Sequence, residues 1–131
     1  MKYVTEDELI AINHFIIKKA GEGAIGLQYP QGLSLVVNQP QQVVFGRELY
    51  PTIWLQAAFI LQKITKKHIF FDGNKRTALI STAVFLDLNG YRLIHTDIEA
   101  ENFILMVTIS ADSEEMMMIV ANWLHEHAIK K

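Results

Sequence analysis

The sequence predicts an all-α fold, a compact bundle of about six helices with room for one small β-hairpin flap. Apolar residues recur at three- and four-residue spacing over most of the chain, a period typical of helices. Capping boxes at Thr5–Glu8 and Thr96–Glu99 mark two helix starts, and Asn89-Gly90 marks a helix end. The chain of 131 residues has the length of one domain, so we expect a single domain over residues 1–131.

The first helix is expected to follow Thr5 and to end at the glycines at positions 21 and 23, because the apolar residues between them keep helical spacing. Residues 24–46 are the least decided part of the chain. Prolines and glycines surround an apolar patch there, and a short helix, a small hairpin and a mobile flap all fit this pattern.

The helix expected over residues 49–67 is apolar on most of its faces, which is typical of a helix at the centre of a bundle. A second interior helix is expected over residues 77–88. The second capping box opens a helix over residues 97–109, and an acidic stretch opens a last helix over residues 112–127.

Composition excludes several classes of protein. The net charge is −2, half of the residues are hydrophobic and a fifth are charged, so the chain is globular and has no basic field for direct nucleic-acid binding. It has no cysteine, which rules out disulfides, thiolate catalysis and cysteine-based zinc sites. The N-terminus lacks the apolar core of a signal peptide and no apolar run is long enough to span a membrane, so we expect a cytoplasmic protein without membrane contact.

Several residues with reactive or bulky side chains fit structural roles better. Trp54, Trp123 and the methionines at 116–118 have apolar neighbours and are expected in the core. His125 and His127 are two residues apart on a helix, so they face different directions and form a poor metal pair. We expect both histidines at the surface.

The nine residues from His68 to Arg76 are the most informative part of the chain. They contain a base, a carboxylate, a glycine, an amide and two cations, and they lie between the two interior helices. Free backbone N–H groups and the helix dipole favour an anion at the start of a helix, so this segment suits phosphate binding. The lysines at 63, 66 and 67, just before it, are expected to form a solvated face.

Two residues of this segment are candidates for catalysis and metal binding. Histidine is the side chain best suited to take a proton from a hydroxyl at physiological pH, so His68 is a candidate base, although a lone histidine after a helix is more often structural. Asp72 is the only acid in the segment. It can bind Mg²⁺ together with phosphate oxygens, or it can form a salt bridge or a helix cap. Phe70 is expected to be a buried anchor for the loop.

Four residues are candidates for binding nucleotide phosphates. Gly73 permits positive φ and lets backbone N–H groups approach an anion. Asn74 can donate to a phosphate oxygen through its amide, or cap the following helix. Lys75 and Arg76 at a helix N-terminus are unfavourable by about 0.3–1 kcal/mol each when exposed, a placement that makes sense if an anion lies there.

The segment reads H-x-F-x-D-x-N-K-R and resembles the signature of the Fic/Doc family in its Doc form. The likeness continues over residues 41–91, and residues 8–12 resemble the first helix of that family. The resemblance implies a compact helical bundle with the signature between two core helices, and a flap beside the site that holds the target protein in extended form. It also implies His68 as the base, Asp72 on Mg²⁺, and residues 74–76 on the phosphates.

The same resemblance implies an enzyme that uses ATP and Mg²⁺. Most Fic proteins have glycine at the position of Lys75 and transfer AMP, whereas Doc-type members have lysine and transfer the γ-phosphate. The expectation is a toxin kinase that phosphorylates a Thr or Ser of a protein in translation, with elongation factor Tu as the implied target, and that halts translation. A cognate antitoxin is the implied partner. AMP transfer and a non-catalytic regulatory module are the alternatives.

Two features differ from the family pattern. Residues 28–38 carry no charge, where Doc-type proteins usually have polar and charged residues. Ser110 and Glu114 have the spacing of the inhibitory motif of self-restrained Fic proteins, but Glu115 stands where glycine or asparagine belongs. Restraint is therefore expected from a partner.

Overall fold

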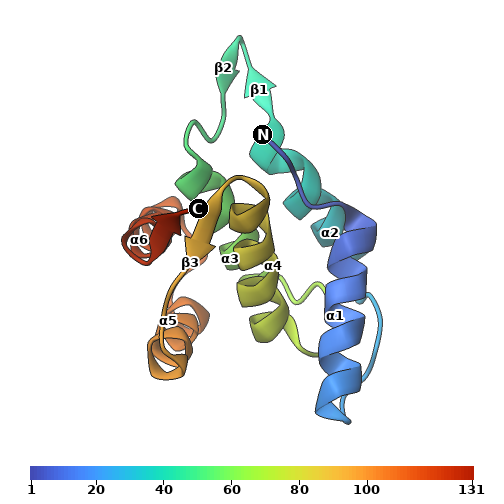
Figure 1. Cartoon of the computed structure of the whole chain (residues 1–131). Coiled ribbons are helices and arrows are strands. Elements are labelled where there is room, and N and C mark those ends of the chain that lie inside the picture. Colours follow the sequence, from blue (N-terminus) through green and yellow to red (C-terminus); the bar gives the residue numbers. More distant parts are fainter.

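The chain forms six α-helices, one 3₁₀ turn and two small two-stranded sheets (Figure 1). The computed structural model describes all residues, 1–131. The helices are α1 (Glu6–Ala20), α2 (Pro30–Asn38), α3 (Ile53–Lys66), α4 (Asn74–Leu88), α5 (Asp97–Ile109) and α6 (Glu114–Glu126). The strands are β1 (Val43–Val44), β2 (Arg47–Glu48), β3 (Tyr91–Leu93) and β4 (Ala128–Lys130), and the 3₁₀ turn is η1 (Gln39–Gln41). The predicted all-α class is confirmed. None of the helices combines the length and the apolar character needed to cross a lipid bilayer.

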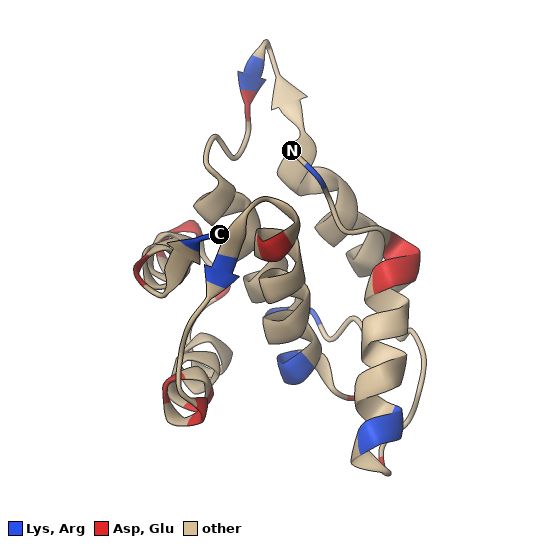
Figure 2. Cartoon of the chain, viewed as in Figure 1, with Lys and Arg blue, Asp and Glu red and all other residues tan.

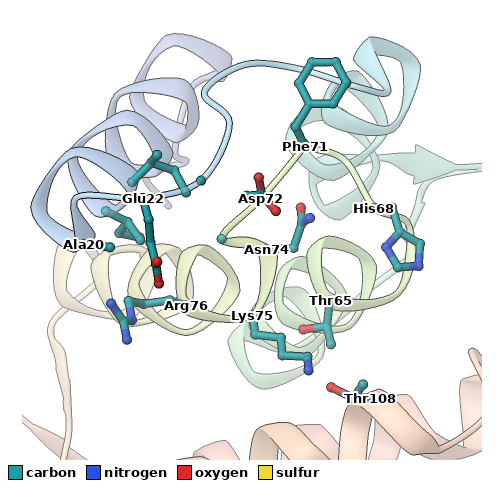
Figure 3. Close-up of a pocket in the computed structure, with 14 residues that line it drawn as sticks. Ala20, Glu22, Thr65, His68, Phe71, Asp72, Asn74, Lys75, Arg76 and Thr108 are labelled. Atoms are coloured by element: carbon teal, nitrogen blue, oxygen red, sulfur yellow. The ribbon is translucent and has the colours of Figure 1, made fainter.

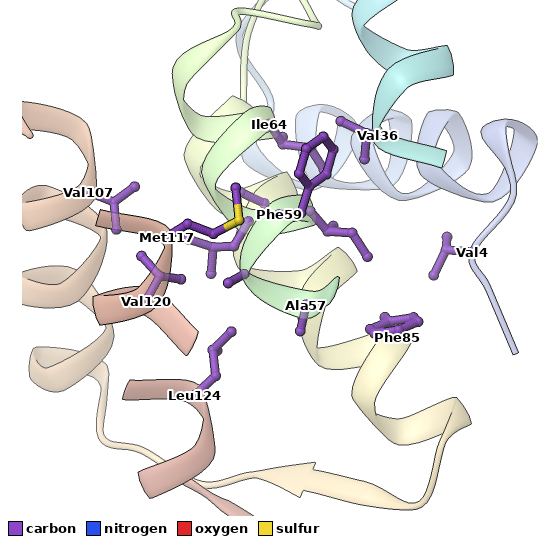
Figure 4. Close-up of a cluster of buried hydrophobic side chains, with 14 of the residues drawn as sticks. Val4, Val36, Ala57, Phe59, Ile64, Phe85, Val107, Met117, Val120 and Leu124 are labelled. Atoms are coloured by element: carbon purple, nitrogen blue, oxygen red, sulfur yellow. The ribbon is translucent and has the colours of Figure 1, made fainter. Parts of the chain in front are cut away.

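Helix α3 lies at the centre of the bundle, as its apolar sequence predicts. It packs against α2, α4, α5 and α6, and its residues 56–62 are all buried. Each neighbour contributes to one apolar cluster around it, for example Val36 of α2, Phe85 of α4, Val107 of α5 and Met117 of α6 (Figure 4). Met117 is the only fully buried one of the three methionines predicted for the core. The signature loop therefore follows the most deeply buried helix.

Helix starts follow their caps. Both predicted capping boxes form, at Thr5 and Thr96. Helix α3 begins later than predicted, because Thr52 caps it by accepting a hydrogen bond from the N–H of Leu55 at 3.1 Å. Helix α4 begins earlier than predicted, directly after Gly73, which adopts a left-handed conformation.

The undecided residues 24–46 contain a helix and the first strand and turn of a hairpin, whose second strand follows directly. Helix α2 starts at Pro30, whose missing N–H is tolerated in a first turn. Strands β1 and β2 pair through a turn at Phe45 and Gly46, which have φ of 50° and 75°. All four strand residues and Phe45 are exposed. The hairpin therefore buries almost nothing of its own.

This hairpin lies at the opposite end of α3 from the signature loop (Figure 1). The hairpin precedes the N-terminus of α3, and the signature follows its C-terminus. A helix of 14 residues is about 21 Å long, so the two are well separated. A small hairpin exists, but it is not the flap that the family resemblance implies beside the site.

The second sheet joins segments that are far apart in the sequence. Strands β3 and β4 are antiparallel, with Arg92 opposite Ile129. The N–H of Ile94 also donates to the main-chain oxygen of His127 at 2.6 Å. The sequence did not indicate this sheet, because each strand has three residues and its partner is remote. The pairing fixes the C-terminus beside the end of α4.

The three lysines predicted to form a solvated face instead tie α3 to the connection between α5 and α6. Lys63 and Lys67 pair with Asp112 at 2.6 and 3.2 Å. Lys66 donates to two main-chain oxygens at the end of α5, at 2.8 and 2.5 Å. Burial alone would raise the pKa of the Asp112 carboxyl, but the hydrogen bonds and charges of Lys63 and Lys67 outweigh it and lower the pKa. The prediction failed because these partners lie more than 40 residues further along the chain.

His125 of α6 and His127, directly after the end of α6, both stack on tryptophan side chains. Trp123 lies between Phe103 and His127, with ring centroids 3.8 Å away on both sides. His125 stacks on Trp54 with centroids 4.5 Å apart. Both tryptophans are partly buried and His125 is exposed, but His127 is half-buried rather than at the surface.

Candidate active site

The signature residues line an open cleft of about 760 Å³ (Figure 3). The loop that joins α3 to α4 forms its floor, the C-terminal end of α1 forms one wall, and α5 contributes to another. All six residues predicted for catalysis, metal binding and phosphate binding line this cleft: His68, Asp72, Gly73, Asn74, Lys75 and Arg76. These six residues therefore lie together at one cleft, and the roles predicted for them stay predictions.

His68 stands exposed at the rim of the cleft. Its φ of 51° lies in the left-handed region, which is uncommon for a residue with a side chain. The two following residues, Ile69 and Phe70, are buried, so they fix the loop on the core, as predicted for Phe70. The amide of Gln28 donates to the main-chain oxygen of His68 at 3.2 Å. The imidazole is thus held outward, where it can reach a bound hydroxyl.

Asp72 is attached to the segment that follows α1. One carboxylate oxygen, Oδ2, accepts a hydrogen bond from the N–H of Ala24 at 2.6 Å. Asp72 makes no ion pair with Lys75 or Arg76 and does not cap α4. The salt-bridge and cap interpretations therefore do not hold. The second oxygen, Oδ1, has no partner among the protein groups.

The segment beside the signature is residues 24–29, not the β1–β2 hairpin. Its Gly26 carbonyl accepts from the N–H of Phe71 at 3.1 Å, and Leu27 forms an antiparallel bridge with Phe70. The N–H groups of Gln28 and Tyr29 both donate to the carbonyl of Ile69. This uncharged segment runs along the loop like a short strand and covers one side of the site.

Gly73 is required at its position for two reasons. Its φ is 75°, a conformation that residues with a Cβ rarely adopt. A Cβ there would also lie 2.9 Å from Cδ1 of Ile17 and 3.4 Å from Nδ2 of Asn13. The turn into α4 is therefore pressed closely against α1.

The N-terminus of α4 is open. Helices α1, α3, α5 and α6 are each capped by a threonine or serine hydroxyl, whereas α4 has no side-chain cap. The N–H groups of residues 73–76 donate to no group of the protein; the first bond of the helix is from Thr77 to the carbonyl of Gly73. These four residues line the cleft, and their unpaired N–H groups and the helix dipole create a positive potential at this helix end.

Asn74 has a different side-chain role from the one predicted. Its Oδ1 accepts from the N–H of Phe70, and its Nδ2 donates to the carbonyl of the same residue, both at 2.9 Å. The amide therefore fastens the signature loop to the start of α4. The backbone N–H of Asn74, rather than its side chain, is the group left for an anion.

Lys75 and Arg76 are exposed and point to different sides of the cleft (Figure 3). Lys75 extends toward Thr65 and Thr108, while Arg76 extends toward the side of Glu22. Neither cation makes an ion pair within the protein. Two unpaired positive charges thus flank the open helix end, where Figure 2 shows the start of α4 in blue, although they do not converge on one point.

Other elements bring further residues to the cleft that the sequence pattern did not indicate. Glu22, Thr65 and Thr108 come from the loop after α1, from α3 and from α5, and nothing in the sequence linked them to the signature. Asn13 of α1 is buried next to the turn and bonds to it. One signal could have found it: Asn13 is a polar residue on the apolar face of α1, four residues after Leu9.

The cleft holds two carboxylates, Asp72 of the signature and Glu22 of the loop after α1, but no complete metal site. No group of three or more His, Cys, Asp or Glu residues could hold a metal on its own. Mg²⁺ in nucleotide sites is commonly held by one or two carboxylates plus phosphate oxygens and water. Asp72, with Oδ1 unpartnered, fits a metal that arrives with a nucleotide.

Comparison with known proteins agrees with this geometry. The family model described as "Fic/DOC family" matches residues 3–86, which include α3, the signature and most of α4. The chain belongs to the Fic/Doc family. Among curated Fic/Doc proteins, it is 43% identical over 61 residues to "Toxin Doc" of Mycolicibacterium smegmatis, a match that covers 47% of each protein. It is 31% identical over 93 residues to "Protein kinase doc" of Escherichia phage P1, which covers 71% of this chain and 72% of the phage protein. The chain thus matches about half the length of the first relative and more than two thirds of the second.

Proposed function

We propose that this Fic/Doc protein is a Doc-type toxin that transfers the γ-phosphate of ATP to a Thr or Ser hydroxyl of another protein. The observation that carries the proposal is the open N-terminus of α4, with Lys75 in its first turn and the exposed His68 across the cleft. An anion site and a candidate base then line the same cleft. The printed names of the two relatives, a toxin and a protein kinase, support the same reaction class.

The triphosphate would be bound by main-chain N–H groups and two cations. The N–H groups of residues 73–76 have no partner in the protein, and Gly73 lets a phosphate approach them closely. Lys75 and Arg76 diverge, so each would neutralise a different phosphate of an extended chain. Positioning and charge neutralisation of this kind supply most of the catalysis in phosphoryl transfer.

Asp72 would bind Mg²⁺ through Oδ1. The hydrogen bond from Ala24 to Oδ2 fixes the carboxylate and leaves Oδ1 for a cation. Hydrogen bonds of this type commonly orient carboxylates that bind metals. Mg²⁺ bound to the phosphates would neutralise charge on them during transfer.

His68 would act as the general base. Its imidazole takes the proton of the target hydroxyl as that oxygen forms a bond to the γ-phosphorus. The bond between the γ-phosphorus and the β–γ bridging oxygen breaks, and ADP leaves with the electron pair. The products are ADP, a phosphorylated Thr or Ser, and a proton on the imidazole that returns to solvent.

Position 75 would decide which bond is broken. A glycine there would leave a bare backbone pocket, whereas Lys75 places a charged side chain in the cleft. We expect Lys75→Gly to weaken γ-phosphate transfer and to let AMP transfer appear. Unchanged phosphate transfer by Lys75→Gly would show that this position does not set the reaction.

The biological target would be a protein of translation, with elongation factor Tu as the first candidate, and its phosphorylation would stop growth. The cleft is open to solvent, so restraint by a cognate antitoxin is part of the proposal. The relative of Mycolicibacterium smegmatis, named as a toxin, supports this assignment.

The test is incubation of the protein with bacterial lysate and ATP that is radiolabelled on either the α- or the γ-phosphate. The proposal predicts one main labelled protein with the γ label and none with the α label. Label from the α-phosphate would establish AMP transfer instead. Absence of both labels, with ATP unbound in calorimetry, would indicate a non-catalytic module.

A further inference from the structure

Asn13 is a polar side chain buried in α1 next to the signature turn. Only 1% of it is exposed. Its Nδ2 donates to the main-chain oxygen of Asp72 at 2.9 Å and to Oγ1 of Thr77 at 3.1 Å. A buried amide costs free energy unless it is hydrogen-bonded, so both bonds stabilise this placement. The side chain links α1 to both ends of the turn that opens α4.

The bond to Asp72 fixes the direction of one peptide plane. In a trans peptide the C=O and the following N–H point in opposite directions, and this chain has no cis peptide. Asn13 holds the C=O of Asp72, so the N–H of Gly73 points away from Asn13. That N–H has no partner in the protein, and Gly73 lines the cleft.

The glycine at position 73 allows the peptide plane between Asp72 and Gly73 to adopt the opposite orientation. Gly73 can adopt positive and negative φ about equally, so the peptide between residues 72 and 73 is able to turn over. Turned over, it would present the C=O of Asp72 to the cleft, and that oxygen would repel a phosphate. Asn13 opposes the change, because it would leave the buried Nδ2 with one bond fewer.

We propose that Asn13 is a positioning residue for phosphate binding, which holds the Asp72–Gly73 peptide with its N–H directed at the nucleotide. The inference rests on the proposed function and names how an element outside the signature prepares the site. With this peptide fixed, four consecutive N–H groups, from Gly73 to Arg76, are free for one anion. Runs of this kind are common anion-binding sites.

Two variants separate positioning from general stability. Asn13→Leu removes both hydrogen bonds with a side chain of similar size. Thr77→Val removes only the bond from Asn13 to Thr77 and leaves the bond to Asp72 in place. Affinity for Mg·ATP is measured by calorimetry at a temperature where circular dichroism shows both variants folded.

We expect Asn13→Leu to bind Mg·ATP about tenfold or more weakly, the effect of losing one hydrogen bond to a charged group. Thr77→Val should stay close to the wild-type affinity. Equal affinity of Asn13→Leu and wild type, or equal losses in the two variants, would overturn the proposal.

If Asn13→Leu does not fold, an NMR measurement on the wild-type protein tests the proposed role of Asn13 instead. The ¹⁵N-labelled protein is titrated with inorganic tripolyphosphate, and amide resonances are followed by NMR. The Gly73 resonance should shift together with those of residues 74–76. Shifts at 74–76 without one at Gly73 would refute the role of Asn13 and leave the proposed function intact. A titration in which no resonance moves, together with no binding of Mg·ATP, would contradict the proposed function itself.

Discussion

The backbone of His68 adopts a left-handed conformation, which residues with a side chain disfavour. A φ of 51° costs about 1 kcal/mol or more for a residue with a side chain. The buried side chains of Ile69 and Phe70 and the hydrogen bond from Gln28 impose this conformation. Strain of this kind persists only where the surroundings enforce it. Here it directs the imidazole outward at the rim of the cleft.

Replacing His68 should separate chemistry from binding. Asparagine tolerates the left-handed region better than most residues, so His68→Asn should keep the fold. It removes the base, and we expect transfer of the γ-phosphate to fall by about 10²- to 10⁴-fold while the affinity for Mg·ATP is retained. Transfer is measured with labelled ATP and binding by calorimetry. Wild-type transfer by this variant, or full growth arrest on its expression, would rule out His68 as the base.

Two glycines with the same φ provide a matched test of the packing at the turn. Gly21 and Gly73 both have φ of 75°, but a Cβ at Gly21 would meet nothing within 4 Å, and one at Gly73 would clash with Ile17. Gly21→Ala should destabilise the protein by about 1 kcal/mol, through the backbone alone. Gly73→Ala should cost about 1–3 kcal/mol more, because of overpacking. Denaturant unfolding measures both values, and equal losses would mean that the contact with Ile17 relaxes freely.

The sequence indicated which residue types gather at the site, but not which partners their side chains contact. The base, the acid, the glycine and the two cations could be read from their spacing, because a loop of nine residues must bring them close together. The side-chain partner of Asn74 could not, since an amide chooses among nearby acceptors only in the folded loop. Asn13 was missed for a related reason, as its partners lie about 60 residues away.

At the scale of the elements, the difference between α4 and the other long helices is the main support for the proposed function. A hydroxyl cap satisfies the first turn of α1, α3, α5 and α6, and α4 begins at a glycine without one. Uncapped N–H groups that lie in an open cleft suit an anion from outside the chain. At another helix end the chain supplies the partner itself: Lys66 of α3 donates hydrogen bonds to main-chain oxygens at the C-terminal end of α5.

The contact between α3 and the α5–α6 connection should make part of the free energy of unfolding depend on pH in the acidic range. Lys63 and Lys67 lower the folded-state pKa of Asp112 despite its burial. The stabilisation is therefore fully present above the usual carboxyl pKa and is lost as the pH falls through the lowered folded value. Asp112→Asn should remove this part of the acid dependence and cost about 1 kcal/mol or less near pH 7, as expected for a partly exposed pair. Denaturant unfolding between neutral and strongly acidic pH tests it; an unchanged pH profile would mean that the pair contributes nothing.

At the scale of the whole molecule, helical periodicity predicted the six-helix bundle and the central place of α3, because apolar spacing reports burial directly. The position of the hairpin and the pairing of β3 with β4 did not follow from the sequence. Both depend on which distant segments meet, and short strands carry little pattern of their own. The walls of the cleft could not be predicted for the same reason, because they come from α1, α3 and α5, which are distant in the sequence. Local sequence thus predicts the chemistry, while the packing of the bundle sets its surroundings.

The central claim is that the open end of α4 binds the triphosphate of a nucleotide, and a calorimetric titration tests it most directly. Mg·ATP is titrated into the wild type, into Lys75→Gln, and into Lys130→Gln, which removes the same charge from β4, outside the cleft. We predict one Mg·ATP per wild-type chain, affinity about tenfold weaker for Lys75→Gln, and no change for Lys130→Gln. A wild-type protein that binds no Mg·ATP, or a Lys75→Gln variant that binds it as tightly as the wild type, would contradict the claim.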